Sequence, residues 1–247
     1  MPPTALRRAA RICLMLMVFT ALAATAAPWV TRANGDALIG LDLGYLAGEL
    51  RDQPHPVAQL FVEALQLPVF LAILLAPGVA VRSRQGRIGA VFLGLLATAV
   101  AVLMAISLHS RIEDYWEPAW EQRYELFAVA VGLVAVVVLA AVVALAAGRG
   151  QAYAVAVALL LVGSAAFHLY SVAVLSSLTS IGVEVSPLAW APGLTWLLAA
   201  GCALVAARTD RAGGASGAGG GHRDRVEPGE RRTAEPAATE AYGAPQG

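Results

Sequence analysis

The run Leu126–Ala147, LFAVAVGLVAVVVLAAVVALAA, contains 22 residues and not one charged or amide side chain. A helix needs about 20 consecutive apolar residues to cross the hydrocarbon core of a bilayer, so this run predicts a transmembrane helix. Five further runs have comparable length and composition. They cover residues 12–30, 57–81, 88–108, 152–175 and 188–207. The sequence therefore predicts an all-α, polytopic bundle of six transmembrane helices over residues 12–207.

The composition of the chain also restricts its chemistry. The 247 residues are 58% hydrophobic and 14% charged, with a mean hydropathy of +0.67. All 17 basic residues are Arg, which fits a GC-rich bacterial genome and excludes any site that depends on a lysine, such as a phosphate-binding loop or a Schiff base. Cys13 and Cys202 lie in apolar runs, far from metal-binding spacing. We expect no enzyme activity, no cofactor and no metal.

The loops between the runs differ in charge. The N-terminal segment and the loops after the second and fourth runs carry seven Arg and no acid, whereas the other loops carry four Arg and ten acids. Arg accumulates in cytoplasmic loops, so both termini are predicted to lie in the cytoplasm, beneath the bacterial plasma membrane. Tryptophans near the opposite ends of the runs fit an aromatic belt at the outer interface. They are Trp29, Trp116, Trp120, Trp190 and Trp196.

The two ends of the chain are expected to lie outside the bundle. Residues 1–11 form a short cytoplasmic segment, and residues 208–247 carry six Arg, six acids and a Gly-rich stretch without apolar periodicity. Such a composition predicts a disordered cytoplasmic tail. An alternative exists for the first run, because its flanking Arg residues and the sequence Ala24-Thr25-Ala26 resemble a secretory signal. Cleavage after Ala26 would leave five spans.

Two of the runs carry polar side chains at a depth where lipid is expected. Spacings of four and then three residues place each set on one face of its helix. The second run contributes Gln59, Glu63 and Gln66, and the fifth contributes Ser164, His168 and Ser171. Polar groups within a membrane are costly and often functional. These six residues form the candidate intramembrane polar site.

Glu63 and His168 are expected at similar depths in the outer half of the membrane. If their spans are neighbours, the two side chains could pair and carry a proton. The alternative is that Gln59 and Glu63 reach interfacial water while His168 bonds to an adjacent helix. Pro68 removes one backbone hydrogen bond, which is expected to open the second span near this site.

The first outer loop contains a second candidate feature. Gly40, Gly44 and Gly48 recur at four-residue intervals. In a helix they would form a flat groove that another helix can approach closely. Alternating apolar residues in the same stretch also fit a short extended segment, and a Gly-rich irregular loop is equally consistent.

The sequence favours a non-catalytic accessory or complex-forming membrane subunit. Its expected partners are the lipid bilayer and either another membrane protein or a second copy of the chain, and no nucleic acid. The alternative is a small-solute or ion permease with an outward-facing polar site around Glu63 and His168. The inner halves of the runs are almost free of polar groups and no internal repeat is evident, both of which disfavour a transporter.

Overall fold

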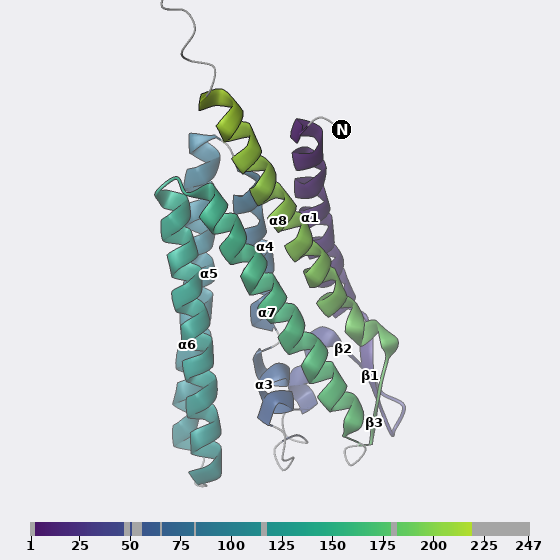
Figure 1. The fold of residues 1–247 in the computed structure, drawn as a ribbon. Coiled ribbons are helices and arrows are strands. Elements are labelled where there is room, and N and C mark those ends of the chain that lie inside the picture. The colour runs from purple at the N-terminus through teal and green to yellow at the C-terminus, as the bar shows by residue number, and fades with distance from the viewer. Residues whose placement is uncertain are drawn as a thin grey trace, which may run out of the picture.

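The computed structural model describes residues 3–46, 50, 56–64, 66–81, 83–114, 118–178 and 182–218. These residues are mostly helical (Figure 1). Five long helices contain an apolar stretch with the length and composition needed to cross a membrane. They are α1 (Pro3–Thr25), α5 (Arg84–Ser110), α6 (Pro118–Ala146), α7 (Gly150–Ser177) and α8 (Ala191–Ala218). The mostly helical fold predicted from the sequence, with helices long and apolar enough to span a membrane, is therefore confirmed.

The second apolar run does not form one straight helix. It consists of α3 (Pro56–Ala64) and α4 (Gln66–Ala80), which are bent by 51° at the break between them. Pro68 has no N–H for the carbonyl four residues earlier, which belongs to Ala64, and a proline is tolerated in the first turn of a helix. The break thus lies where the sequence predicts it, and the expected total of six spans depends on counting this pair as one.

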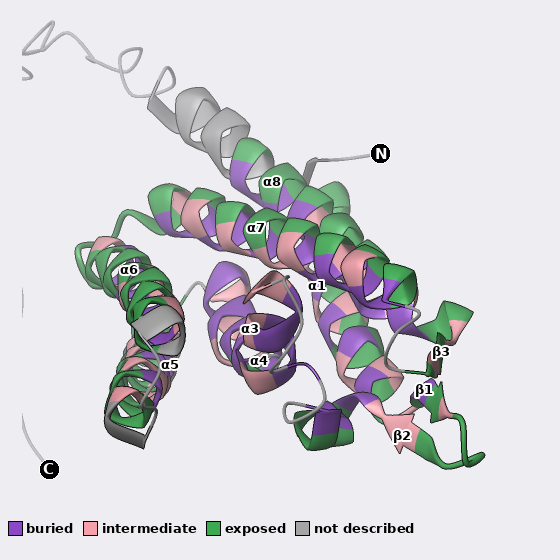
Figure 2. Ribbon diagram, turned by 90° about the horizontal axis from the view of Figure 1, so that it is seen from below, coloured by how far each residue is buried: buried purple, intermediate pink, exposed green. Residues whose placement is uncertain are grey.

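α4 occupies the middle of the bundle. It packs against α1, α5 and α7, while Phe70, on the side that faces none of the core, is exposed. Its buried residues cover about 200° of the helix circumference. They are Leu67, Val69, Leu71, Ala72, Leu75, Ala76, Gly78 and Val79. Around it, α1 packs on α8, α8 on α7, and α5 on α6. Viewed along the bundle, α3 and α4 lie between the α5–α6 pair and the remaining helices (Figure 2).

A small antiparallel sheet closes one end of the bundle, which we call the β end. Its strands are ordered β2 (Ala37–Ile39), β1 (Pro28–Arg32) and β3 (Val183–Val185), with Val30 opposite both Leu38 and Val185. The 3-10 helices η1 (Gly40–Leu46) and η4 (Pro187–Trp190) adjoin it. The start of α1 and the end of α8 lie at the opposite end (Figure 1).

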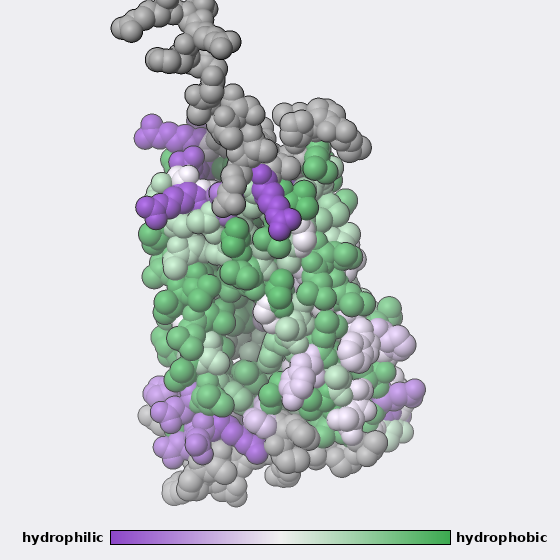
Figure 3. Space-filling view, viewed as in Figure 1, coloured by the Kyte–Doolittle hydropathy of each residue, from purple (hydrophilic) through white to green (hydrophobic). Residues whose placement is uncertain are grey.

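The surface separates by polarity. On the face drawn in Figure 3, a predominantly apolar band covers the middle of the described helices, and polar side chains gather at both ends. Many large apolar residues of α5 and α6 are exposed, Ile88, Phe92 and Leu133 among them. Apolar residues in contact with lipid are not a liability as they are in water. The band is therefore compatible with a membrane location.

Several boundaries differ from the sequence-based expectation. The first span was expected to reach Val30, but α1 ends at Thr25 and Pro28 begins β1. At the other end of the chain, α8 continues to Ala218, so the first eleven residues of the expected tail, 208–218, are helical. Residues 219–247 lie outside the described residues. α1 forms part of the core, because Leu14, Val18 and Ala21 are buried.

The aromatic-belt interpretation is wrong for two of the five tryptophans. The side chains of Trp29 and Trp196 are fully buried among protein atoms, so they do not lie among lipid headgroups. Trp190 is partly exposed at the β end. Trp116 lies outside the described residues.

Candidate functional site

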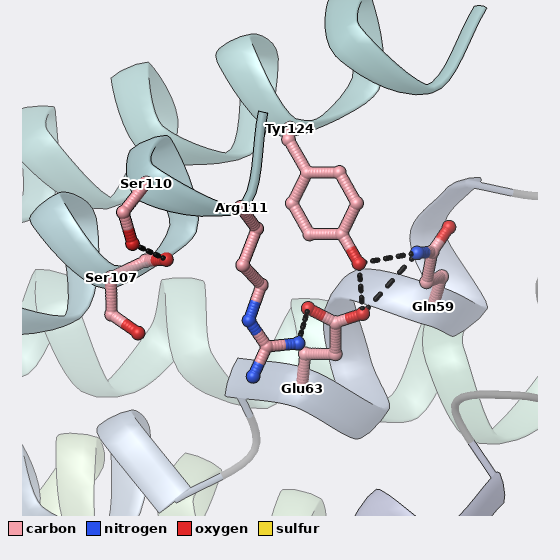
Figure 4. Close-up of polar contacts among 6 residues, drawn as sticks. All are labelled: Gln59, Glu63, Ser107, Ser110, Arg111 and Tyr124. Atoms are coloured by element: carbon pink, nitrogen blue, oxygen red, sulfur yellow. Dashed lines mark hydrogen bonds and ion pairs between the residues drawn. The ribbon is translucent and has the colours of Figure 1, made fainter. Parts of the chain in front are cut away.

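Glu63 is the centre of a polar cluster near the β end of the bundle (Figure 4). Its carboxylate accepts from three side chains, two of which belong to other elements of the fold. The Tyr124 hydroxyl of α6 donates to Oε1 at 2.6 Å, and Nη1 of Arg111 lies 3.1 Å from Oε2. Arg111 begins η2 (Arg111–Asp114), directly after α5. A single acidic side chain thus connects α3 to both members of the α5–α6 pair.

Gln59 completes this cluster from one turn earlier on α3. Its Nε2 donates to Glu63 Oε1 at 3.2 Å and to the Tyr124 hydroxyl at 3.0 Å. The predicted common face of Gln59 and Glu63 is therefore present. Among the described residues, Gln59 Oε1 has no hydrogen-bond partner although the side chain is only 2% exposed.

The exposure of the members shows where the cluster meets solvent or headgroups. The side chain of Glu63 is 5% exposed, whereas that of Arg111 is 45% exposed. The carboxylate is covered by protein, and the guanidinium lies at the outer edge of the fold. Partly exposed ion pairs contribute modestly to stability, but the bonds to buried Tyr124 are shielded from water and should contribute more.

His168 belongs to a different cluster. Its ring is completely buried, and Nε2 lies 2.7 Å from the carbonyl oxygen of Ala189 in η4. Three aromatic rings meet the imidazole edge to face, with centroid separations of 5.2 Å for Trp29 and Phe61 and 5.3 Å for Trp196. We call these four residues the histidine cage. Within the described part of the chain, His168 Nδ1 accepts no hydrogen bond.

The structure does not bring Glu63 and His168 together as a pair. Phe61 packs on His168, and Glu63 is only two residues further along α3. Two residues correspond to a rotation of about 200° around a helix. When Phe61 faces α7, Glu63 must face away from it, towards α5 and α6. The two ionisable residues consequently serve separate contacts.

The other members of the predicted polar site are dispersed. Gln66 follows the break in the second run and is exposed, because the bend carries it away from the face of Glu63. Ser171 is buried and donates to the carbonyl of Phe167 in its own helix at 2.7 Å. Ser164 lines an apolar cavity described below. The six residues thus form no single site.

The expected glycine groove has a different geometry. Residues 40–46 form a 3-10 helix, in which buried positions recur every three residues, at Gly40, Leu43 and Leu46. A spacing of four residues therefore places Gly44 on another side from Gly40. Gly44 is exposed with open space around it, Gly40 packs against Trp29, and Gly48 lies outside the described residues.

Replacement of Gly40 by alanine is expected to destabilise the fold. A Cβ atom there would lie 2.7 Å from Cε2 of Trp29 and 2.8 Å from the backbone oxygen of Thr25. Overpacking of this kind costs about 1–2 kcal/mol of unfolding free energy. Thermal unfolding in detergent, followed by circular dichroism, would measure it. Gly44→Ala is the matched control and should change little; equal stability of both variants would contradict the contact.

The sequence did not single out the partners of the two ionisable residues. Arg111 is one of two bases in an acidic loop at the same end of the bundle as Glu63. That contrast is a signal from which the ion pair could have been suspected. Tyr124 and the three aromatic residues of the histidine cage carry no comparable signal, since aromatic side chains are common in any core.

The described residues contain no group of three or more His, Cys, Asp or Glu that could hold a metal ion. No known protein family, characterised protein or solved structure matches the chain.

Proposed function

We propose that this protein is a non-catalytic accessory subunit that forms a complex in the bacterial plasma membrane. In this proposal the chain crosses the bilayer six times, with α3 and α4 together forming one crossing, and both termini are cytoplasmic. An even number of crossings fits the position of the start of α1 and the end of α8 at one end of the bundle (Figure 1). The orientation rests on the distribution of Arg between the loops.

One observation carries the accessory role. Both carboxylate oxygens of Glu63 are engaged by side chains of the same protein, on α6 and at the end of α5. Ser171 and Nε2 of His168 are likewise bonded to backbone oxygens. Glu63 and His168 thus connect different elements of the fold and Ser171 bonds within its own helix, and these groups are not arranged around a space that a polar solute could enter. Function is then expected on the outer surfaces of the bundle.

Affinity purification from native membranes tests this proposal. We expect one membrane protein, a different chain or a second copy, to remain bound at a fixed stoichiometry. Gly44 is exposed at the β end with room for a larger side chain, so Gly44→Leu should reduce the retained partner about fivefold, the effect of losing roughly 1 kcal/mol of contact.

The control for this experiment is Gly150→Leu. Gly150 also has open space around it but begins α7 at the opposite end of the bundle. It should retain the partner at the level of the unchanged protein. Purification of the chain as a monomer without any bound protein would overturn the accessory role.

The permease alternative is favoured by one feature, the break between α3 and α4. Interrupted helices commonly surround the substrate in transporters, and Glu63 lies one residue before the end of α3. In this alternative, the ion pair with Arg111 would open to admit a solute or proton. A variant of Glu63 discriminates between the two functions and is described in the Discussion.

A further inference from the structure

Two cavities are lined by successive turns of α3 and α6. The first, of about 490 Å³, is lined at the β end by Pro56 and by Gln122, Arg123, Glu125, Leu126 and Val129 of α6. The second, of about 560 Å³, is lined on the next turns of the same helices by Leu60 and Ala64 of α3 and by Ala130, Val131, Val134 and Val137 of α6. Residues 56, 60 and 64 share one face of α3.

The second cavity is apolar and opens sideways. Its other walls come from α4 and from Leu159, Leu160, Gly163, Ser164 and Phe167 of α7. Among its lining residues Ser164 is the sole polar side chain. In Figure 3 the apolar band is hollowed between α6 and α7. The cavity therefore faces the medium that surrounds the bundle, which at this depth is hydrocarbon.

The two cavities together form a groove, and the polarity of its lining changes along its length. Gln122 and Arg123 supply N–H donors and Glu125 a carboxylate at the β end, whereas the deeper part is lined by Val, Leu and Ala. A donor-rich group beside a carboxylate complements a zwitterion, in which a phosphate lies close to an amine. An amphiphile with such a headgroup and a hydrocarbon chain matches this order of surfaces.

The length of the groove agrees with one leaflet of a bilayer. Gln122 and Val137 mark its ends on α6 and are 15 residues apart, which is about 22 Å along a helix. A bilayer including its headgroups is about 40–45 Å thick, so one leaflet is about 20–22 Å. Each cavity also has a volume usual for small-molecule sites, about 300–1,000 Å³.

We propose that this groove binds one zwitterionic phospholipid, with its headgroup beside Gln122, Arg123 and Glu125 and an acyl chain between α6 and α7. The bound lipid fills the space that the bend between α3 and α4 leaves beside α7. This lipid site is independent of the accessory role.

Photolabelling tests the site directly. The protein is reconstituted into vesicles that contain phosphatidylethanolamine with a photoreactive diazirine midway along one acyl chain, and labelled peptides are identified by mass spectrometry. Label should concentrate on residues 130–137 and 159–167. Uniform labelling of the exposed faces of α5 and α8 as well would show only surrounding bulk lipid and would overturn the proposal.

A variant of Gly163 provides the occlusion test. Gly163 lines the cavity, and a Cβ atom there meets nothing within 4 Å, so Gly163→Leu should fill the space without disturbing the helices. It should lower labelling of the groove at least about fivefold, the effect of losing one or two buried methylenes of contact. Gly201→Leu makes the same change at an open, exposed position of α8 and should leave labelling unchanged.

Competition in the unchanged protein provides a test that does not depend on a variant. Unlabelled phosphatidylethanolamine with full-length chains should displace the probe from the groove more effectively than the same amount of diacylglycerol, which lacks the headgroup. Equal displacement by both would remove the headgroup from the proposal. A dimer that seals the groove and excludes the probe, detected by native mass spectrometry, would show that a second copy occupies it instead.

Discussion

Replacement of Trp29 by alanine is expected to lower the free energy of unfolding by about 3–5 kcal/mol, the usual cost of removing a large buried aromatic ring. Trp29 is fully buried in β1. Its indole N–H donates to the carbonyl of Ala24 in the last turn of α1 at 2.7 Å, and its ring packs on His168 and Gly40. The variant would disconnect the first helix, the sheet and the histidine cage at once.

Denaturation by sodium dodecyl sulfate, followed by circular dichroism, is the appropriate measurement because it does not depend on tryptophan fluorescence. Trp190→Ala is the matched control, since Trp190 is partly exposed at the same end of the bundle and should lose less stability. Trp29→Phe should fall between the two, because it keeps an aromatic ring but loses the bond to Ala24. A loss for Trp29→Ala no greater than for Trp190→Ala would contradict its central role.

Replacement of Glu63 by leucine is the second large effect that we expect, about 2–4 kcal/mol. Tyr124 and Gln59 are 1% and 2% exposed, and both donate to this carboxylate. Buried donors left without an acceptor cost about 1–3 kcal/mol each, although the bond between Tyr124 and Gln59 can persist. Arg111→Ala should cost less than about 1 kcal/mol, because Arg111 is 45% exposed and a partly exposed ion pair contributes little.

The same residue separates the two candidate functions. Glu63→Gln keeps an oxygen that can accept from Tyr124, so the bundle should remain folded in the membrane. A permease that uses this carboxylate would lose solute or proton flux across proteoliposomes, whereas an accessory subunit would retain its partner. Loss of flux in a folded Glu63→Gln variant would favour the permease.

The stability prediction has its own contradicting outcome. Destabilisation by Arg111→Ala equal to that of Glu63→Leu would contradict the geometry of the cluster.

The candidate site was only partly predictable. The four-residue spacing of Gln59 and Glu63 correctly placed them on one face, since that relation is internal to a single helix. The expected partnership between Glu63 and His168 required α3 to face α7 with Glu63, and the structure has Phe61 in that position. The rotation of a helix about its axis depends on packing with all its neighbours, which spacing within the helix does not encode.

The sequence by itself determined the apolar helices and the interruption of the second run near Pro68. Both depend on local physics, because a backbone in lipid must bond to itself within each helix and a proline disrupts that bonding wherever it occurs. Only the tertiary structure decided that Glu63 bonds to Arg111 and Tyr124, that aromatic rings enclose His168, and that a groove opens between α6 and α7. Those outcomes depend on which helices are neighbours and how each is turned, and contacts between residues distant in the chain fix both.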